Sequence, residues 1–282
     1  PRTRSRTLRR LAGALLVAGA AVALWIGAAI LFLDSFIFYP ERSGDWEARR
    51  RSRFRIEEVE LGTPDGERLV SWFLRVEAPR ASVLFFHGNA GNLTHRLDVL
   101  ETLAGLGLDA FVLGYRGYGR STGKASEAGL YLDAEAAYAH VTGSAGVAPD
   151  RLLLLGESLG CAVAVDLAAK RPCAGIVLQS PFLSIAEMAT QVIPLPPLKW
   201  IVPRKFDNLG RIPKVAAPKL FLAARRDEVV PFGQTRRLFE AAPGEKEWAQ
   251  FEDCGHNDLF LLHRREWTDA VARFVDRVCP AR

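Results

Sequence analysis

The sequence predicts an α/β fold in which a mostly parallel central sheet carries helices on both faces. Short apolar runs of strand length alternate with stretches of helical periodicity, the pattern of parallel strands joined by crossover helices. The run Leu152–Leu155 also leads directly into Gly156-Glu157-Ser158-Leu159-Gly160, so a buried strand turns sharply into a helix with a serine at the bend. Together these observations place residues 56–282 in one α/β domain.

The N-terminal part of the chain predicts a membrane anchor. A basic flank, residues 1–10, precedes a run of 23 uncharged residues from Leu11 to Leu33. As a helix this run would measure about 35 Å, enough to cross a hydrocarbon core of about 30 Å. A cleaved secretory signal is the alternative that stays open, although the apolar part of such a signal usually has only about 7–15 residues.

The charges around this run predict its orientation. Arg9 and Arg10 abut it with no acid nearby, whereas Asp34 follows it and the downstream arginines are mixed with acidic residues. We therefore expect a single-pass protein with a cytoplasmic N-terminus and the folded domain on the non-cytosolic side. Residues 1–55 carry eleven arginines and four acidic residues, so their net charge is +7. Because the net charge of the whole chain is +5, the remaining residues, which form the domain, have a net charge of −2. No nucleic-acid partner is expected, because binding would need a basic face on that domain.

After a charged linker, residues 34–55, the strands and helices follow in order. Ile56–Leu61 and Leu69–Val76 flank a Thr-Pro-Asp-Gly turn and predict an antiparallel hairpin at a sheet edge. The predicted parallel strands are Ser82–Phe86, Ala110–Leu113, Arg151–Leu155, Gly175–Leu178 and Lys219–Ala223, with a strand-like run at Glu247–Phe251. The predicted helices are Leu93–Leu106, Ser126–His140, Cys161–Lys170, Gln234–Ala242 and Arg264–Val278.

The alternation fails between about residues 181 and 213, where repeated prolines forbid long helices. The segment is nevertheless apolar. We expect a small cap insertion over the carboxyl edge of the sheet that lines an apolar substrate pocket; simple packing on the domain is the alternative.

The serine at the bend predicts nucleophilic chemistry. A serine hydroxyl needs a base to take its proton, and a carboxylate must hold that base in the right tautomer. Ser158 is the expected nucleophile. The glycines on either side let the helix pass close to the strand, and the tight turn between them holds the serine hydroxyl clear of its neighbours. His256, in a glycine-containing loop after the last predicted strand, is the expected base, whereas His263 stands where the final helix begins.

The expected acid is Asp227, which follows a predicted strand at the edge where catalytic groups of open α/β sheets gather. Its neighbour Glu228 is the rival. Asp207 lies in the proline-rich insertion and is more consistent with a helix cap or a turn.

Two peptide N–H groups are expected to form an oxyanion hole. One belongs to Leu159, directly after the nucleophile, and the other to Asn89, in the glycine-containing loop after the strand Ser82–Phe86. His87 in the same loop is expected to be structural. The loop lacks the endings typical of phosphate loops, so no nucleotide or other cofactor is expected.

The cysteines predict neither a metal site nor a disulfide scaffold. Cys161, Cys173, Cys254 and Cys279 form no Cys-x-x-Cys pair and have no histidine at zinc-finger spacing. We expect small buried side chains, with a Cys161–Cys173 bridge left open if the domain is exported.

With these motifs in order, the sequence resembles the α/β-hydrolase superfamily, particularly its membrane-anchored serine hydrolases, which include acyl-protein depalmitoylases, lysophospholipases and serine aminopeptidase-like enzymes. The resemblance spans roughly Phe85 to Leu262 and rests on His87-Gly88-Asn89-Ala90-Gly91-Asn92, Tyr115-Arg116-Gly117-Tyr118-Gly119, Gly156-Glu157-Ser158-Leu159-Gly160, Arg226-Asp227-Glu228 and Gly255-His256-Asn257-Asp258. It implies a Ser158, Asp227, His256 triad and cofactor-free hydrolysis of esters or thioesters. Ala224 departs from the glycine that such enzymes often carry before the acid loop.

The resulting expectation is a membrane serine hydrolase whose partner is a small-molecule or lipid ester. A serine aminopeptidase-type peptidase with the same residues is the first alternative. A non-catalytic membrane scaffold is a second, since a fold by itself does not prove activity.

Overall fold

The computed structural model describes residues 33–192, 202–203 and 205–280, together with isolated positions between residues 13 and 27. The chain divides into two compact units, Pro1–Phe38 and Tyr39–Arg282. The first unit contains the short helix α2, Leu33–Ile37. Most of the predicted span Leu11–Leu33 lies outside the described residues, and none of the helices within them has the length and apolarity that a bilayer crossing requires. The membrane anchor therefore stays a prediction.

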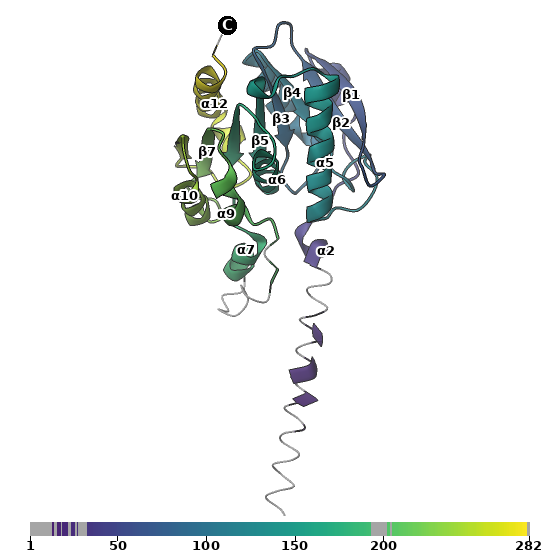
Figure 1. Cartoon of the computed structure of the whole chain (residues 1–282), viewed down its shortest axis with the longest axis vertical. Coiled ribbons are helices and arrows are strands. Elements are labelled where there is room, and N and C mark those ends of the chain that lie inside the picture. The colour runs from purple at the N-terminus through teal and green to yellow at the C-terminus, as the bar shows by residue number, and fades with distance from the viewer. Residues whose placement is uncertain are drawn as a thin grey trace, which may run out of the picture. The chain divides into compact units, whose positions relative to one another are not determined.

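The second unit is built on one eight-stranded sheet with the order β1-β2-β4-β3-β5-β6-β7-β8 (Figure 1). Its strands are β1 Arg55–Gly62, β2 Arg68–Arg75, β3 Ala81–Phe86, β4 Leu108–Val112, β5 Leu152–Glu157, β6 Gly175–Gln179, β7 Lys219–Ala224 and β8 Lys246–Phe251. The pairs β1–β2 and β2–β4 are antiparallel, and every other pair is parallel. The predicted edge hairpin and the mostly parallel sheet are both confirmed.

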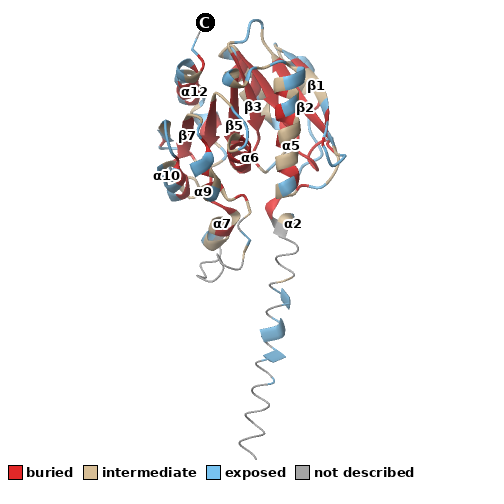
Figure 2. Cartoon of the chain, viewed as in Figure 1, coloured by how far each residue is buried: buried red, intermediate tan, exposed pale blue. Residues whose placement is uncertain are grey.

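Helices cover both faces of this sheet. They are α3 Ala48–Arg51, α4 Leu97–Gly105, α5 Glu127–Ala139, α6 Leu159–Ala168, α7 Ile185–Val192, α9 Asn208–Arg211, α10 Phe232–Ala241, α11 Leu259–Leu262 and α12 Arg264–Val278. The apolar residues of α4 and α12 join one buried cluster with alternate strand residues such as Phe85 and Leu155. Helices α5, α6 and α10 lie on the opposite face (Figure 1). Figure 2 shows the buried residues concentrated along the central strands between these layers.

Local hydrogen bonds explain where several helices begin. Ser126 caps α5, because its hydroxyl accepts from the peptide N–H of Gly129 at 3.1 Å. The helix predicted from Leu93 starts instead as a 3₁₀ turn, Leu93–Arg96, which the side chain of Asn92 caps at Thr94 N with a distance of 2.9 Å. Asp207 caps α9 at Gly210 N, as its place in the insertion predicted. Much of the rest of the insertion, residues 193–201 and 204, lies outside the described residues.

Residues 39–54 pack on the sheet domain rather than standing apart from it. The buried Trp46 ring meets Trp72 of β2 edge-on, with ring centroids 6.0 Å apart. Pro40 forms a parallel bridge with Gly91, in the loop after β3. The four cysteines are free thiols, and Cys161, Cys254 and Cys279 are buried.

A buried ion pair fixes the loop after β4. The guanidinium of Arg116 donates to Asp133 of α5 at 2.8 Å and to Asp65 in the β1–β2 turn at 2.6 Å. The peptide N–H of Arg116 also donates to Asp133. Burial raises the pKa of Asp133 to about 6, although its hydrogen bonds from Arg116 act in the opposite direction. This pair therefore ties the loop, the turn and a helix into one unit.

We expect Asp133→Ala to lower the free energy of unfolding by about 3 kcal/mol, because it removes one of the two carboxylates that bind a buried guanidinium and leaves the buried peptide N–H of Arg116 without its acceptor. Urea unfolding of the full chain measures the change. Asp98→Ala is the matched control, since Asp98 pairs with Arg264 at the exposed surface, and it should cost less than about 1 kcal/mol. Equal losses in the two variants would show that the buried pair has no special role.

Candidate functional site

Ser158 lies in a strained turn between β5 and α6. Its backbone has φ 51° and ψ −112°, a conformation that residues with a side chain rarely adopt. A Cβ atom at Gly160 would lie 1.9 Å from the carbonyl oxygen of Phe86, and one at Gly156 would lie 2.5 Å from Cys161 Cα. Only glycine fits at either position. The close approach of α6 to β3 and β5 therefore requires both glycines that flank the serine.

The structure brings Ser158, His256 and Asp227 into one chain of hydrogen bonds. The imidazole Nε2 of His256 lies 2.9 Å from Ser158 Oγ, and its Nδ1 lies 2.8 Å from Asp227 Oδ2. The side chains of His256 and Asp227 are only 8% and 2% exposed. Because the carboxylate can only accept, Nδ1 carries the proton and Nε2 is free to accept from the serine hydroxyl. The arrangement can withdraw a proton from Ser158.

Asp227 is held in place by its own loop. Its second oxygen, Oδ1, accepts from the peptide N–H groups of Val229 at 3.0 Å and Val230 at 2.6 Å. The three side chains come from the turns after β5, β7 and β8, which end at the same edge of the sheet because these strands are parallel.

The other candidate residues have different places. Glu228 accepts from the peptide N–H of His256 at 3.1 Å, so it holds the backbone of the histidine loop while Asp227 binds the imidazole. His263 is the residue just before α12, at its N-cap, and its Nδ1 lies 4.0 Å from Glu266.

The two peptide groups predicted to bind an oxyanion lie after adjacent strands. Asn89 follows β3 and Leu159 follows β5, and these strands pair in parallel up to Phe86 and Gly156. Leu159 is the first residue of α6, so its N–H has no acceptor within the helix. The side chain of Asn89 accepts from the Tyr118 hydroxyl at 2.8 Å and from Tyr39 N at 3.1 Å. These bonds hold the loop through the side chain of Asn89.

His87 supports this loop from inside. It is fully buried, and its Nδ1 donates to the carbonyl of Gly88 at 2.7 Å. The Tyr115 hydroxyl donates to the carbonyl of His87 at 3.2 Å. Burial lowers the pKa of His87 to about 3, so the ring is neutral in the folded protein. These contacts agree with the structural role that the sequence predicted.

Sequence reasoning missed an ion pair beside the nucleophile. Arg96 Nε lies 3.0 Å from the carboxylate of Glu157, the residue before Ser158, and Arg96 Nη2 donates to the carbonyl of Ala90 at 3.2 Å. One guanidinium therefore joins the serine turn to the loop that carries Asn89. Both side chains are mostly buried, with 16% and 28% exposed. No local pattern could reveal the pair, since its members are far apart in the sequence.

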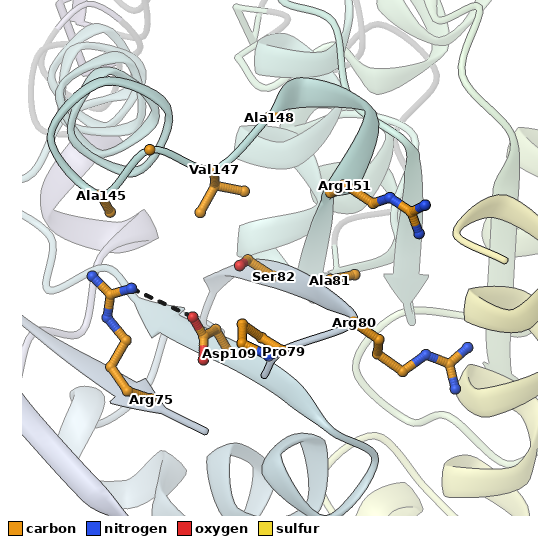
Figure 3. Close-up of a pocket in the computed structure, with 11 residues that line it drawn as sticks. Arg75, Pro79, Arg80, Ala81, Ser82, Asp109, Ala145, Val147, Ala148 and Arg151 are labelled. Carbon is orange, nitrogen blue, oxygen red and sulfur yellow. Dashed lines mark ion pairs between the residues drawn. The ribbon is translucent and has the colours of Figure 1, made fainter. Parts of the chain in front are cut away.

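Two of the cavities in the described part of the chain lie at opposite ends of the parallel strands. A cavity of about 170 Å³ adjoins the serine turn and is lined by Arg96, Glu157, Gln179, Asn257 and Leu261, among others. A larger one, of about 380 Å³, lies at the other end, where Arg75 pairs with Asp109 at 3.5 Å (Figure 3). Arg80 and Arg151 point away from its centre, toward Asp276 and Pro280 respectively (Figure 3). The larger cavity is therefore lined by the Arg75–Asp109 ion pair, which has no net charge, and its other two arginines are bound to residues outside it.

Comparisons with known proteins agree with this architecture. Residues 77–211 match the family described as Serine aminopeptidase, S33. An uncharacterized protein of Mycobacterium tuberculosis is 40% identical over 220 residues, which cover 77% of this chain and 78% of that one. Alpha/beta hydrolase domain-containing protein 17C of Xenopus tropicalis is 32% identical over 241 residues, with 84% and 75% covered.

The fold recurs among solved structures. An esterase of Pyrococcus furiosus superposes with a TM-score of 0.72 at 21% identity and covers 86% of this chain and 98% of its own. At 21% identity that likeness concerns the fold alone. The sequence relatives are 40% and 32% identical over most of both chains. On the strength of the strand–serine–helix turn, the sheet order and these relatives, the chain belongs to the α/β-hydrolase superfamily.

Proposed function

We propose that the protein is a serine hydrolase that cleaves carboxylic ester or thioester bonds through an acyl-enzyme at Ser158. The observation that carries the proposal is the uninterrupted chain of hydrogen bonds from Ser158 Oγ through the imidazole of His256 to the buried carboxylate of Asp227. A serine hydroxyl with an imidazole nitrogen at 2.9 Å is a nucleophile with its base already in position.

The reaction follows from this geometry. As Ser158 Oγ attacks the substrate carbonyl, His256 Nε2 takes the hydroxyl proton and Asp227 stabilises the imidazolium that forms. The carbonyl oxygen becomes an oxyanion, for which the peptide N–H groups of Leu159 and Asn89 are the donors. His256 then gives its proton to the leaving alcohol or thiol. Water then attacks the acyl carbon while the same nitrogen takes its proton, and this proton passes to Ser158 Oγ as the acyl–oxygen bond breaks and the acid leaves.

An apolar or lipid-like substrate is proposed from the sequence. The apolar insertion about residues 181–213 lies between Ser158 and Asp227 along the chain, and the uncharged run Leu11–Leu33 would place the enzyme at a membrane. We propose the orientation with the domain outside the cytosol, and protease protection of the domain in sealed cells tests it. No cofactor has a part in the proposed reaction.

A peptidase is the second candidate, because the matching family is described as a serine aminopeptidase. The same acyl-enzyme would form on an amide, with His256 protonating an amine instead of an alcohol. Parallel assays on p-nitrophenyl esters of graded chain length and on aminoacyl anilides separate the two candidates. Cleavage of the esters without measurable cleavage of the anilides supports the first, and cleavage of the aminoacyl anilides supports the second.

We expect Ser158→Ala to abolish covalent labelling by a fluorophosphonate probe and to lower kcat for ester hydrolysis by at least about 10³-fold, because the attacking oxygen is removed. Gel fluorescence measures the labelling. Ser180→Ala is the matched control, since Ser180 also follows a parallel strand and has a positive φ of 51°. Equal labelling of the Ser158→Ala variant and the unchanged chain would refute the proposal.

Asp227→Asn should lower kcat by about 10³- to 10⁴-fold, because an amide at this position can hold the imidazole in the wrong tautomer. Glu228→Gln should change kcat by less than about fivefold, since the amide oxygen still accepts from His256 N. Steady-state hydrolysis of p-nitrophenyl butyrate gives both values. A larger loss from the Glu228 change would identify that residue, and not Asp227, as the acid.

Arg96→Gln should lower kcat about tenfold with little change in KM. Without the guanidinium, the Glu157 carboxylate is uncompensated beside a developing oxyanion, and a charge about 10 Å away interacts by about 1.7 kcal/mol at an effective dielectric constant of about 20. Adding Glu157→Gln to this variant should restore most of the rate, because the uncompensated charge disappears. If the double variant is as slow as Arg96→Gln alone, the pair acts only by holding the loop.

A further inference from the structure

The exposed apolar side chains of the Tyr39–Arg282 unit gather at one edge of the sheet. Among its described residues, the large apolar side chains that are exposed are Tyr39, Val229, Leu261 and Leu262, with exposed fractions of 63%, 44%, 64% and 61%. Single exposed apolar residues are common on protein surfaces. Here all four belong to segments that carry or contact the carboxyl-edge loops, and none lies elsewhere on the described surface of the unit.

Each of these residues is tied directly to the candidate site. Val229 follows Asp227 by two residues, and its peptide N–H donates to that carboxylate. Leu261 and Leu262 belong to α11, which is fixed to the histidine loop because Asp258 accepts from Gly255 N at 2.6 Å. Leu261 also lines the cavity beside the serine turn, together with Arg96 and Glu157. The apolar surface therefore borders the Ser158–His256–Asp227 chain.

Tyr39 is attached to the same edge from the N-terminal side. Its peptide N–H donates to the side chain of Asn89, and the next residue, Pro40, bridges to Gly91. Asn92 Nδ2 donates to the carbonyl of Glu41 at 3.0 Å, which extends the attachment along the loop. The chain that enters the domain is thus bound to the loop after β3.

The length of the chain relates this attachment to the predicted span. Tyr39 follows Leu33, the last residue of the uncharged run, by six residues. Six residues reach at most about 20 Å even when fully extended. This short tether joins the predicted span to the loop after β3, at the edge of the sheet that also carries the exposed leucine and valine side chains. Exposed leucine, valine and tyrosine side chains are favourable at a membrane interface.

We infer that the carboxyl edge, through Val229, Leu261 and Leu262 with Tyr39 at the tether, docks on the surface of the lipid bilayer that holds the N-terminal segment. The occupant of this surface is the acyl-chain boundary of the membrane. The mouth of the site then opens onto the bilayer, so an ester can pass from the lipid phase to Ser158 without crossing bulk water. The inference rests on the proposed anchor for its location and on the proposed hydrolase function for its kinetic consequence.

The docking is tested by fluorescence quenching on the full chain in phosphatidylcholine vesicles. Leu262→Cys carries an NBD label, and Ala148→Cys, at an exposed position at the opposite edge, is the control; the unsubstituted chain gives the background labelling of the native cysteines. Lipids with a nitroxide high on the acyl chain should quench the label at 262 at least about twofold and leave the label at 148 unchanged. Equal quenching at both positions, or none at 262, overturns the inference. A blue-shifted but unquenched label at 262 also overturns it, because protein then covers the surface.

The kinetic consequence is tested with Leu262→Glu and its control Ala148→Glu. Hydrolysis of a long-chain ester dissolved in the vesicles should fall about tenfold in the first variant and not in the second, while cleavage of water-soluble p-nitrophenyl acetate stays unchanged in both. An unchanged rate on vesicles, or an equal fall on both substrates, contradicts the docking. If the unchanged chain cleaves neither ester, the hydrolase proposal fails, and the quenching result still decides the docking.

Discussion

The close passage of α6 over β3 and β5 is the constraint on which the site depends. At Gly160 the helix approaches the carbonyl of Phe86 so closely that no side chain fits, and at Gly156 the strand meets Cys161 in the same way. This packing forces the turn between them into a conformation with φ 51° at Ser158. The strain is offset by a buried core on both sides of β5. As a result the hydroxyl stands at the sheet edge within 2.9 Å of an imidazole.

The rest of the site is assembled by parallel strands that end together. Three loops supply Ser158, Asp227 and His256, and a second set of contacts holds those loops in register. Glu228 binds the backbone of the histidine loop, and Arg96 joins the serine turn to the loop after β3. The hydroxyls of Tyr115 and Tyr118 donate hydrogen bonds to that loop after β3. The carboxylate next to the serine also has its own guanidinium, that of Arg96. A site built this way has its donors oriented before a substrate arrives.

The same edge unites the proposed anchor, substrate and chemistry. The tether enters at the loop that carries Asn89, and the exposed apolar residues of the unit surround the loops that carry Asp227 and His256. In the proposed docking these residues bury apolar surface at the bilayer, and the opposite edge, with its neutral Arg75–Asp109 pair, faces water.

The sequence by itself determined the features that depend on local pattern. Strand-length apolar runs, the helix Arg264–Val278 and the glycines around Ser158 all have signatures within a few residues. The chain order of serine, aspartate and histidine pointed to three residues that hydrogen bonds join in the structure. Tertiary structure alone decided that Glu228 binds the backbone of the histidine loop, that Arg96 pairs with Glu157, and that residues 39–54 pack on the domain. Those contacts join segments distant in the chain, and their energies come from burial and charge pairing, which leave no periodic trace in the sequence.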